Sequence, residues 1–417
     1  MFGKHRSEVL VAGAGPVGLF TAAEAVKRGL DVQIVDAEWR GTGMSYATAL
    51  HPGSVALLRD LGLEDDVVRD AYHVERLVFY EGTERKTIVD LTALGGDHPY
   101  LTIMPQSAME GALERWLSAH KAKVRWRHRL AGITSTHSPT EVTLQRWGDD
   151  SIGYGVAHDE PVIDAVFPFQ AEFLVGADGH RSLVRRRLEY DFREVVPATL
   201  FGVFEFDCKH DLAHEACVVL TEDTTNVLWP LPEGRCRWSF QLRNPAEFEG
   251  ERVKSRLSAL GRWILPSLDE ERLHTLIAER APWFEGGAGE VVWSVAIKFE
   301  QRLSSGFGSG ALWLAGDAAH IASPVGMHSM NVGLREGRDL AEAFHGILRE
   351  GAAPEGLETY AAARRAEWTA LLDLTESLRA SDRATPFVRD NARRILTSIP
   401  ASGENLKTLL RQVNLEL

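Results

Sequence analysis

The chain has 417 residues, of which 44% are hydrophobic and 25% are charged, and its net charge is −13. These values exclude an intrinsically disordered chain and indicate a large globular protein with one large or two closely joined domains. The excess of 59 acidic residues over 46 lysines and arginines argues against general nucleic-acid binding.

The first predicted elements are a strand and a helix joined by a dinucleotide-binding turn. Residues 9–12 are an apolar run that predicts a buried parallel strand, which turns at Gly13 and leads into a helix near Gly15. Gly15 allows the backbone to approach a phosphate, and Gly18 allows the helix to pack against the strand. The spacing of these glycines therefore predicts a bound dinucleotide.

The strand that follows supports this interpretation, because it spans residues 32–35 and ends at Asp36, where a carboxylate can accept ribose hydroxyl groups. The alternatives are a glycine-rich turn without a ligand and a secretory segment, since the apolar stretch follows Lys4 and Arg6. Neither alternative needs the glycine spacing or the acid. From this unit we predict cofactor contacts at Gly13, Gly15, Pro16, Val17, Gly18, Asp36 and Ala37.

Two later segments each place an aspartate after a predicted strand. Residues 173–175 lead into Gly176-Ala177-Asp178-Gly179, and residues 311–315 lead into Gly316-Asp317-Ala318-Ala319-His320. Open parallel sheets bind ligands at the carboxyl ends of their strands. We therefore expect both aspartates to lie at the same site as the first glycine turn.

On these three segments the chain resembles the FAD-dependent aromatic hydroxylases of the p-hydroxybenzoate hydroxylase group, the class A flavoprotein monooxygenases. Residues 173–185 resemble the second signature of that group, which is associated with both FAD and NAD(P)H, and residues 312–320 resemble the third. The resemblance covers nearly the whole chain. It implies an α/β fold with a Rossmann-like FAD-binding domain of the glutathione-reductase type, an inserted β-sheet substrate domain and C-terminal helices.

The resemblance also divides the chain into three parts. The FAD-binding domain is expected at residues 1–72, 101–190 and 301–345, the substrate-binding domain at 73–100 and 191–300, and a helical region at 346–417.

The same resemblance implies further cofactor contacts. Asp317 is expected to hold the ribityl hydroxyls of the flavin, and a helix that begins near Asn331 is expected to direct its positive end at the flavin pyrimidine ring. Gln106 matches a glutamine of the family beside the flavin. The full set of contacts carried over in this way is Gln106, Asp178, Gly179, Arg181, Gly316, Asp317, Pro324, Gly326, Met330 and Asn331.

The chain departs from its relatives at two places. Where they have Gly-Gly-Gln-Gly-Met-Asn, it has Gly326-Met327-His328-Ser329-Met330-Asn331, and where they have an arginine it has Tyr46. Side chains at Met327 and Ser329 restrict the backbone, so we expect a changed flavin position or retention. His328 is the predicted catalytic residue, as a donor to the flavin or to an oxygen adduct; the alternative is a solvent-facing loop residue.

The strand-rich insert at residues 200–300 is expected to bind the substrate. Its aromatic residues Trp229, Trp238 and Trp293 are predicted to line a cavity for a ring. The alternative is that they belong to the core, as most tryptophans in such strands do.

The reaction implied by the resemblance is reduction of FAD by NADPH or NADH, capture of O2 as a flavin C4a-hydroperoxide, and transfer of one oxygen atom to an aromatic or polyketide-like small molecule, as hydroxylation or epoxidation. Two alternatives stay open. One is a redox-silent flavin-fold protein that binds or shapes a metabolite, and the other is a different flavoenzyme, such as a halogenase or a reductase. No Trp-x-Trp-x-Ile-Pro segment of the halogenase type is present.

No metal site is predicted, because Cys208, Cys217 and Cys236 lack paired metal-ligand spacing, and we expect these thiols to be reduced. The expected location is the cytoplasm, without stable membrane association. The expected assembly is a monomer or a homodimer, and no nucleic-acid partner is expected.

Overall fold

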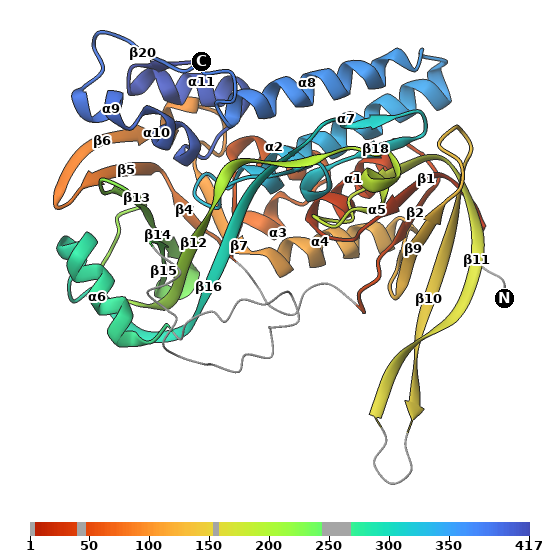
Figure 1. Cartoon of the computed structure of the whole chain (residues 1–417), viewed down its shortest axis with the longest axis horizontal. Coiled ribbons are helices and arrows are strands. Elements are labelled where there is room, and N and C mark those ends of the chain that lie inside the picture. Colours follow the sequence, from red (N-terminus) through yellow and green to blue (C-terminus); the bar gives the residue numbers. More distant parts are fainter. Residues whose placement is uncertain (1–4, 40–46, 153–157, 244–267) are drawn as a thin grey trace.

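The computed structural model describes residues 5–39, 47–152, 158–243 and 268–417. Two eight-stranded sheets lie at opposite ends of the molecule, and a layer of long helices runs along one side between them (Figure 1). The long strands β12 (Phe192–Cys208) and β16 (Ala288–Ser304) extend from one end toward the other.

The first sheet has a parallel centre made from distant parts of the chain. Its order is β17-β18-β11-β1-β2-β8, in which β1 pairs with β2 on one side and with β11 on the other. The β1 residues Val9, Leu10 and Val11 are fully buried, as expected for a strand in the middle of a covered parallel sheet. The strand bounds are β1 (Arg6–Ala12), β2 (Val32–Val35), β8 (Val124–Arg125), β11 (His158–Gly176), β17 (Gly308–Ser309) and β18 (Leu312–Leu314).

An antiparallel ribbon extends this sheet, because β11 continues beyond its parallel part and pairs with β10 (Thr140–Ile152), which in turn pairs with β9 (His128–Ile133). The ribbon projects from the rest of the molecule in Figure 1.

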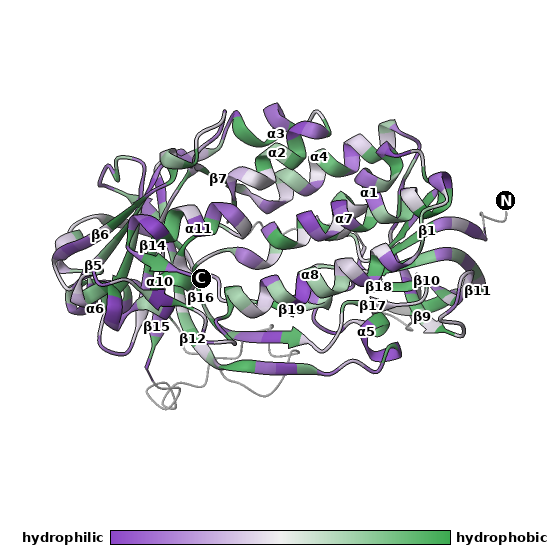
Figure 2. Ribbon diagram, turned by 90° about the horizontal axis from the view of Figure 1, so that it is seen from above, coloured by the Kyte–Doolittle hydropathy of each residue, from purple (hydrophilic) through white to green (hydrophobic). Residues whose placement is uncertain are grey.

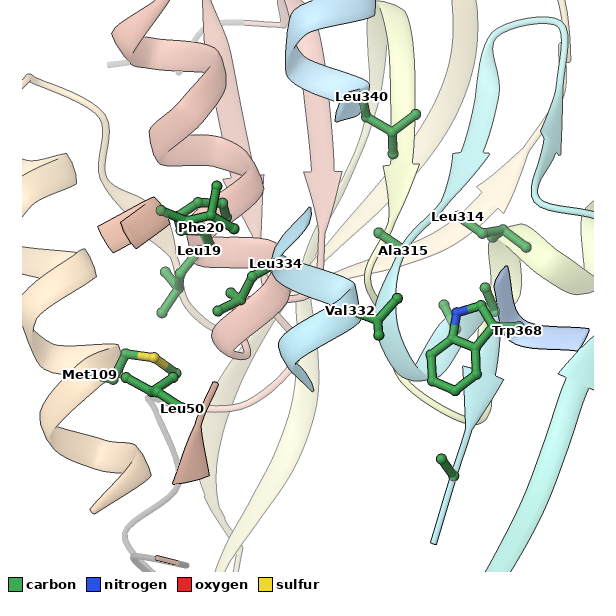
Figure 3. Packing of buried hydrophobic residues seen from close by; sticks show 14 of the residues in the cluster. Leu19, Phe20, Leu50, Met109, Leu314, Ala315, Val332, Leu334, Leu340 and Trp368 are labelled. Atoms are coloured by element: carbon green, nitrogen blue, oxygen red, sulfur yellow. The ribbon is translucent and has the colours of Figure 1, made fainter. Parts of the chain in front are cut away.

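Three helices fill the layer beside the parallel strands. α1 (Pro16–Lys27) packs against α7 (His328–Glu350) and α4 (Gln106–Ala119). Figure 3 shows α7 between two groups of buried side chains, with Leu334 toward Leu19 of α1 and Val332 toward Trp368. Small residues make the contact close, because a Cβ at Gly337 would collide with Thr21 of α1.

The second sheet has the order β19-β16-β12-β15-β14-β13-β5-β6 and carries an aromatic core on the face covered by α6 (Glu270–Arg280). Two of its strands come from the first quarter of the chain. The bounds not yet given are β5 (Arg76–Glu81), β6 (Glu84–Asp90), β13 (Glu215–Leu220), β14 (Thr225–Leu231), β15 (Arg235–Leu242) and β19 (His320–Ile321).

The remaining elements lie around and between the two sheets. A small sheet has the order β3-β7-β4, and the C-terminal helix α11 packs against β6. Polar and apolar residues alternate along α7 and α8 in Figure 2, as expected for helices with one face on the core. The bounds are β3 (Ala47–Leu50), β4 (Tyr72–Val74), β7 (Leu101–Pro105), β20 (Arg379–Ala380), β21 (Leu415–Glu416), α2 (Pro52–Asp60), α3 (Glu64–Val68), α5 (Leu183–Arg187), α8 (Glu355–Leu371), α9 (Pro386–Asp390), α10 (Ala392–Ser398) and α11 (Gly403–Gln412).

The predicted fold class is confirmed, since a parallel α/β sheet is joined to a separate β-sheet and followed by helices. The domain boundaries stay a prediction; the pairing of β5 with β13 is what one expects if residues 73–100 belong with residues 191–300. Within the described ranges, none of the helices combines the length and apolar character needed to cross a membrane.

Glycines 15 and 18 give a matched test of the first turn. A Cβ at Gly18 would collide with the carbonyl oxygen of Gly13, whereas a Cβ at Gly15 would meet no described atom within 4 Å. We expect Gly18→Ala to lower the free energy of unfolding by about 1–3 kcal/mol or more. Gly15→Ala should leave the stability nearly unchanged but weaken cofactor binding. Urea unfolding of the apoprotein checks the first result and flavin titration the second; equal stability of the two variants would contradict the packing argument.

Candidate functional site

The glycine turn after β1 is shaped for a ligand phosphate. Gly13 has φ of +105°, and a Cβ there would collide with the carbonyl oxygen of Ala177, so only glycine fits. Pro16 opens α1, and the first turn of this helix carries neither a side-chain cap nor an acidic residue. The free N–H groups and the positive end of α1 therefore face the open space beside Gly15.

Asp36 lies directly after β2, as the sequence predicted. Its Oδ2 accepts a hydrogen bond from Ala14 N at 2.6 Å, and its Oδ1 accepts one from Glu38 N at 2.8 Å. Each carboxylate oxygen keeps a second lone pair, so Asp36 can still accept a ribose hydroxyl. Ala37 follows it and is exposed.

Only one carboxylate oxygen of Asp178 accepts a hydrogen bond in the described structure. Oδ2 accepts from Leu183 N at 2.7 Å, while Oδ1 is buried and has no partner among the described residues. Burial raises the pKa of Asp178, although the hydrogen bonds from Ser182 and Leu183 oppose the shift. An unpartnered buried carboxylate oxygen next to the glycine turn marks a place for a hydroxyl or amide donor.

Asp317 shows the same character at the end of β18. Its side chain keeps solvent access, and the described residues give it no hydrogen-bond partner. The surrounding protein nevertheless removes much of its water, which raises the pKa of Asp317, and His320 and His180 oppose this shift. Asp178 and Asp317 thus each have carboxylate oxygen atoms that can accept hydrogen bonds from a ligand.

Direct contacts bring the three segments together. Val17 of α1 touches Gly316, where a Cβ would lie only 3.0 Å from the valine side chain. The guanidinium of Arg185 donates to Ala318 O at 2.6 Å and to His180 O at 2.7 Å, so it joins the second segment to the third. The three segments therefore lie side by side at the carboxyl ends of β1, β11 and β18.

A buried polar network holds the third segment in place. Glu336 of α7 accepts from Gly316 N at 2.8 Å, contacts His320 Nε2 at 2.8 Å and accepts from Trp368 Nε1 at 3.0 Å. The His320 ring also stacks on Trp368, with centroids 3.8 Å apart. Burial alone would raise the pKa of Glu336, but His320, Gly316 N and Trp368 together lower it. Sequence analysis missed Glu336.

The loop that leads into α7 is fixed by side chains. Met327 adopts a left-handed conformation with φ of +52°, a region that favours glycine, and Ser329 Oγ accepts from Ala322 N at 2.9 Å. His51 Nε2 lies 3.0 Å from Gly326 O. Ser329 therefore ties the start of α7 to the segment that precedes it. Tyr46, the other departure, lies outside the described residues.

Asn331 also fixes the loop. Its amide donates to Ala49 O and Met327 O and accepts from His51 N, all within 2.7–2.8 Å. Both amide hydrogens of Asn331 are used inside the protein, so this side chain has no N–H left to donate to a flavin. That turn has no side-chain cap and no acidic residue, which leaves its N–H groups available for an electron-rich ring.

His328 does not occupy the position that a catalytic donor needs. The side chain is buried, its Nε2 lies 2.9 Å from Ile399 O, and burial lowers its pKa to about 4. It is neither a solvent-facing loop residue nor directed at open space. The geometry indicates that His328 packs the start of α7 against the C-terminal segment, in place of the catalytic role predicted for it.

The other predicted contacts are less restrained. Gln106 opens α4 and donates to Glu110 at 2.8 Å, Arg181 is exposed, and Pro324 and Met330 are half-buried near the start of α7. Gly179 has φ of +73° and no described atom around a Cβ position, as at Gly15.

A cavity of about 220 Å³ lies beside the same loop. Ser323 and Val325 from the loop form one side, β12, β14, β15 and β16 of the second sheet form another, and α10 closes it. Among the described residues, the lining is Val196, Thr199, Phe201, Thr225, Gln241, Gln301, Ser323, Val325, Leu372, Arg393, Arg394, Thr397 and Ser398. A larger cavity of about 420 Å³ lies between α7, α8 and α11, away from the predicted site residues.

The predicted substrate tryptophans are not in the lining of either cavity. Trp229 and Trp238 are buried in the hydrophobic cores, and Trp238 stacks on Phe240 with centroids 4.7 Å apart. Trp293 donates to Glu205 at 3.1 Å. The alternative reading, in which these side chains are core residues, fits their positions better than contact with a substrate.

The donor and acceptor groups fit FAD. Two uncapped helix ends, the unpartnered Asp178 Oδ1 and the free Asp317 carboxylate suit a pyrophosphate, an electron-rich ring and a chain of hydroxyls.

Fold and site thus define a dinucleotide-binding flavoprotein. The family described as FAD binding domain matches residues 6–375, and the chain belongs to this family. The resemblance found in the sequence is confirmed, and FAD is the cofactor.

Relatives of known activity have monooxygenase names. The chain is 28% identical over 370 residues to a 6-methylpretetramide 4-monooxygenase of Streptomyces rimosus, with 86% of this chain and 59% of the relative covered. It is 24% identical over 380 residues to a pentachlorophenol 4-monooxygenase of Sphingobium chlorophenolicum, covering 89% and 64%. The chain thus spans about three fifths of the length of these two relatives.

A solved p-nitrophenol 4-monooxygenase of Pseudomonas putida has the same fold, with a TM-score of 0.69 at 21% identity and 99% of both chains covered. An aklavinone-11 hydroxylase solved with FAD and aklavinone gives a TM-score of 0.66 at 23% identity, covering 90% of this chain and 68% of the other.

Asp317→Asn should separate cofactor binding from stability. Loss of a charged acceptor for the flavin hydroxyls should weaken FAD binding by roughly 10- to 100-fold. Because the folded-state pKa of Asp317 is raised above its ordinary 3.8, its charge disfavours the folded apoprotein at pH 7, so the variant should be as stable as the wild type or more stable. Flavin titration and thermal unfolding measure the two effects. The exposed Asp70→Asn is the control; a less stable Asp317→Asn apoprotein with normal FAD affinity would reverse the interpretation.

Glu336→Gln tests the buried network. The buried carboxylate accepts from Gly316 N and Trp368 Nε1, and glutamine would turn one of these acceptors into an N–H donor, which should cost about 1–3 kcal/mol at pH 7. The folded-state pKa of Glu336 lies below its ordinary 4.5, so this stabilisation is present above pH 4.5 and is lost as the pH falls through the lowered value. The gap in urea midpoint between wild type and variant should therefore narrow in acid. Glu342→Gln, at an exposed position of α7, is the control, and a pH-independent gap would argue against an ionised Glu336.

Proposed function

We propose that this protein is an FAD-dependent monooxygenase that uses NAD(P)H and O2 to oxidise an aromatic or polyketide-like small molecule. The observation that carries the proposal is the convergence of Gly15, Asp178 and Asp317 on one site, with a cavity beside the loop that follows Asp317. The names of the relatives support the reaction class.

FAD, when bound, accepts electrons from a reduced nicotinamide and passes them to O2, and this redox chemistry belongs to the cofactor. The chain has to bind and orient the flavin. The positive end of α1 would hold the pyrophosphate, Asp317 would accept hydroxyl hydrogens, and the uncapped start of α7 would stabilise negative charge on the ring.

The cavity offers both apolar and polar contacts to a substrate. Phe201, Val325 and Leu372 are buried apolar residues of its wall. An apolar wall limits water beside the reacting atoms and so limits loss of reduced oxygen as hydrogen peroxide. The polar residues Thr199, Gln241 and Gln301 can orient a substituted ring through hydrogen bonds.

Among the residues that the structure describes, none is assigned as a general base. His328 Nε2 lies at hydrogen-bond distance from Ile399 O, and His320 Nε2 lies at hydrogen-bond distance from the Glu336 carboxylate. We propose that the reaction depends on placement of the ring rather than on a histidine of this loop.

We further propose that the protein acts in the cytoplasm as a monomer or a homodimer. Cys208, Cys217 and Cys236 are free thiols, which fits a reducing compartment.

The test is turnover of the FAD-loaded protein with a panel of phenols and fused-ring aromatics. Substrate should accelerate NADPH or NADH oxidation, consume O2 and give a product heavier by one oxygen atom. Asp317→Asn at limiting FAD should lower all three signals in parallel. FAD binding without any of these signals would favour the redox-silent binding protein, and NAD(P)H oxidation without oxygen insertion would favour a reductase.

A further inference from the structure

The wall of the 220 Å³ cavity includes residues beyond the part of the chain that matches the family. The family match ends at residue 375, whereas Arg393, Arg394, Thr397 and Ser398 lie on α10. A Cβ at Gly326, in the loop before α7, would collide with Thr397 O. The C-terminal segment therefore reaches the loop beside the predicted flavin site.

Arg394 fastens this segment to the second sheet. Its guanidinium donates to Thr221 O at 2.7 Å, to Thr225 Oγ1 at 3.1 Å and to Thr224 O, and burial lowers its pKa. Most of its donors are thus used by the protein. Arg394 fixes α10 as a wall and places a positive charge inside it.

Arg393, the residue before Arg394, has N–H groups that make no hydrogen bond within the described chain. It is exposed, and Nη2 donates to Leu372 O at 3.1 Å, while the described part of the chain supplies no acceptor for its Nε and Nη1. The two arginines are the only charged residues in the described lining of the cavity. With two cations and no carboxylate, this lining favours a ligand that carries negative charge.

The volume limits the size of that ligand. A cavity of about 150 Å³ holds benzene, and drug-sized ligands occupy about 300–1,000 Å³. At about 220 Å³, the cavity takes a single substituted ring.

We propose that α10 is the substrate-selecting wall and that Arg393 recognises a negatively charged oxygen, a carboxylate or a phenolate, on a one-ring aromatic substrate. This inference rests on the proposed monooxygenase function, and it narrows the substrate class.

The test compares two ligands of equal size and different charge, 4-hydroxybenzoate and 4-hydroxybenzamide. Binding to the FAD-loaded protein is measured by calorimetry, so that the result does not depend on turnover. The wild type should bind the benzoate at least about tenfold more tightly than the benzamide. Arg393→Gln should weaken benzoate binding by roughly 10- to 100-fold and benzamide binding by less than about threefold. Arg393→Lys should recover part of the loss.

Arg389→Gln is the matched control, because Arg389 is an exposed arginine of the neighbouring helix α9 outside the cavity lining. Anthracene-2-carboxylate tests size and should bind at least about tenfold more weakly than the benzoate. Where turnover is present, Arg393→Gln should raise KM for the benzoate and leave kcat within about threefold.

Equal affinity for the two one-ring ligands, or equal losses in Arg393→Gln and Arg389→Gln, would overturn the assignment even in an active enzyme. Selective benzoate binding without NAD(P)H oxidation or oxygen insertion would uphold Arg393 and refute the monooxygenase function instead.

Discussion

The whole site depends on a close backbone crossing where side chains have no room. The turn at Gly13 lies against the carbonyl of Ala177, and Gly316 lies against Val17. These contacts join the ends of three parallel strands that are far apart in sequence. Since glycine alone permits such an approach, the fingerprint that binds the phosphate is also the contact that assembles the sheet edge.

Around this crossing, some charged side chains have hydrogen-bond partners within the described protein, and others have oxygen atoms without a partner. Glu336 is fully buried, yet each of its carboxylate oxygens accepts a hydrogen bond. The Arg185 guanidinium donates to backbone carbonyls of the turns that follow β11 and β18. Asp178 and Asp317 have raised pKa values and acceptor capacity that the described protein does not use. Buried polar groups with hydrogen-bond partners stabilise the fold. Buried polar groups without partners indicate where a ligand binds.

Sequence patterns predicted the fold class and the FAD cofactor, because glycine spacing and strand-end aspartates are local signals. Glu336 also left a signal, since it stands in line with Val332, Leu340 and Phe344 on the buried face of α7. Nothing local showed that His328 would turn toward Ile399 or that Trp238 would enter the core. The wall formed by α10 depends on the packing of distant segments, which periodicity alone does not reveal.

The strand order also bears on how the chain is made. β1 can pair with β2 once the first 35 residues have been made. Its other neighbour, β11, is complete only at Gly176, and β11 in turn pairs with β18, which begins at Leu312. During ribosomal synthesis the nascent N-terminal half therefore presents an apolar strand with an open edge for most of the translation time. A product truncated before β18 would keep that edge, so the last quarter of the polypeptide is needed to complete the parallel sheet.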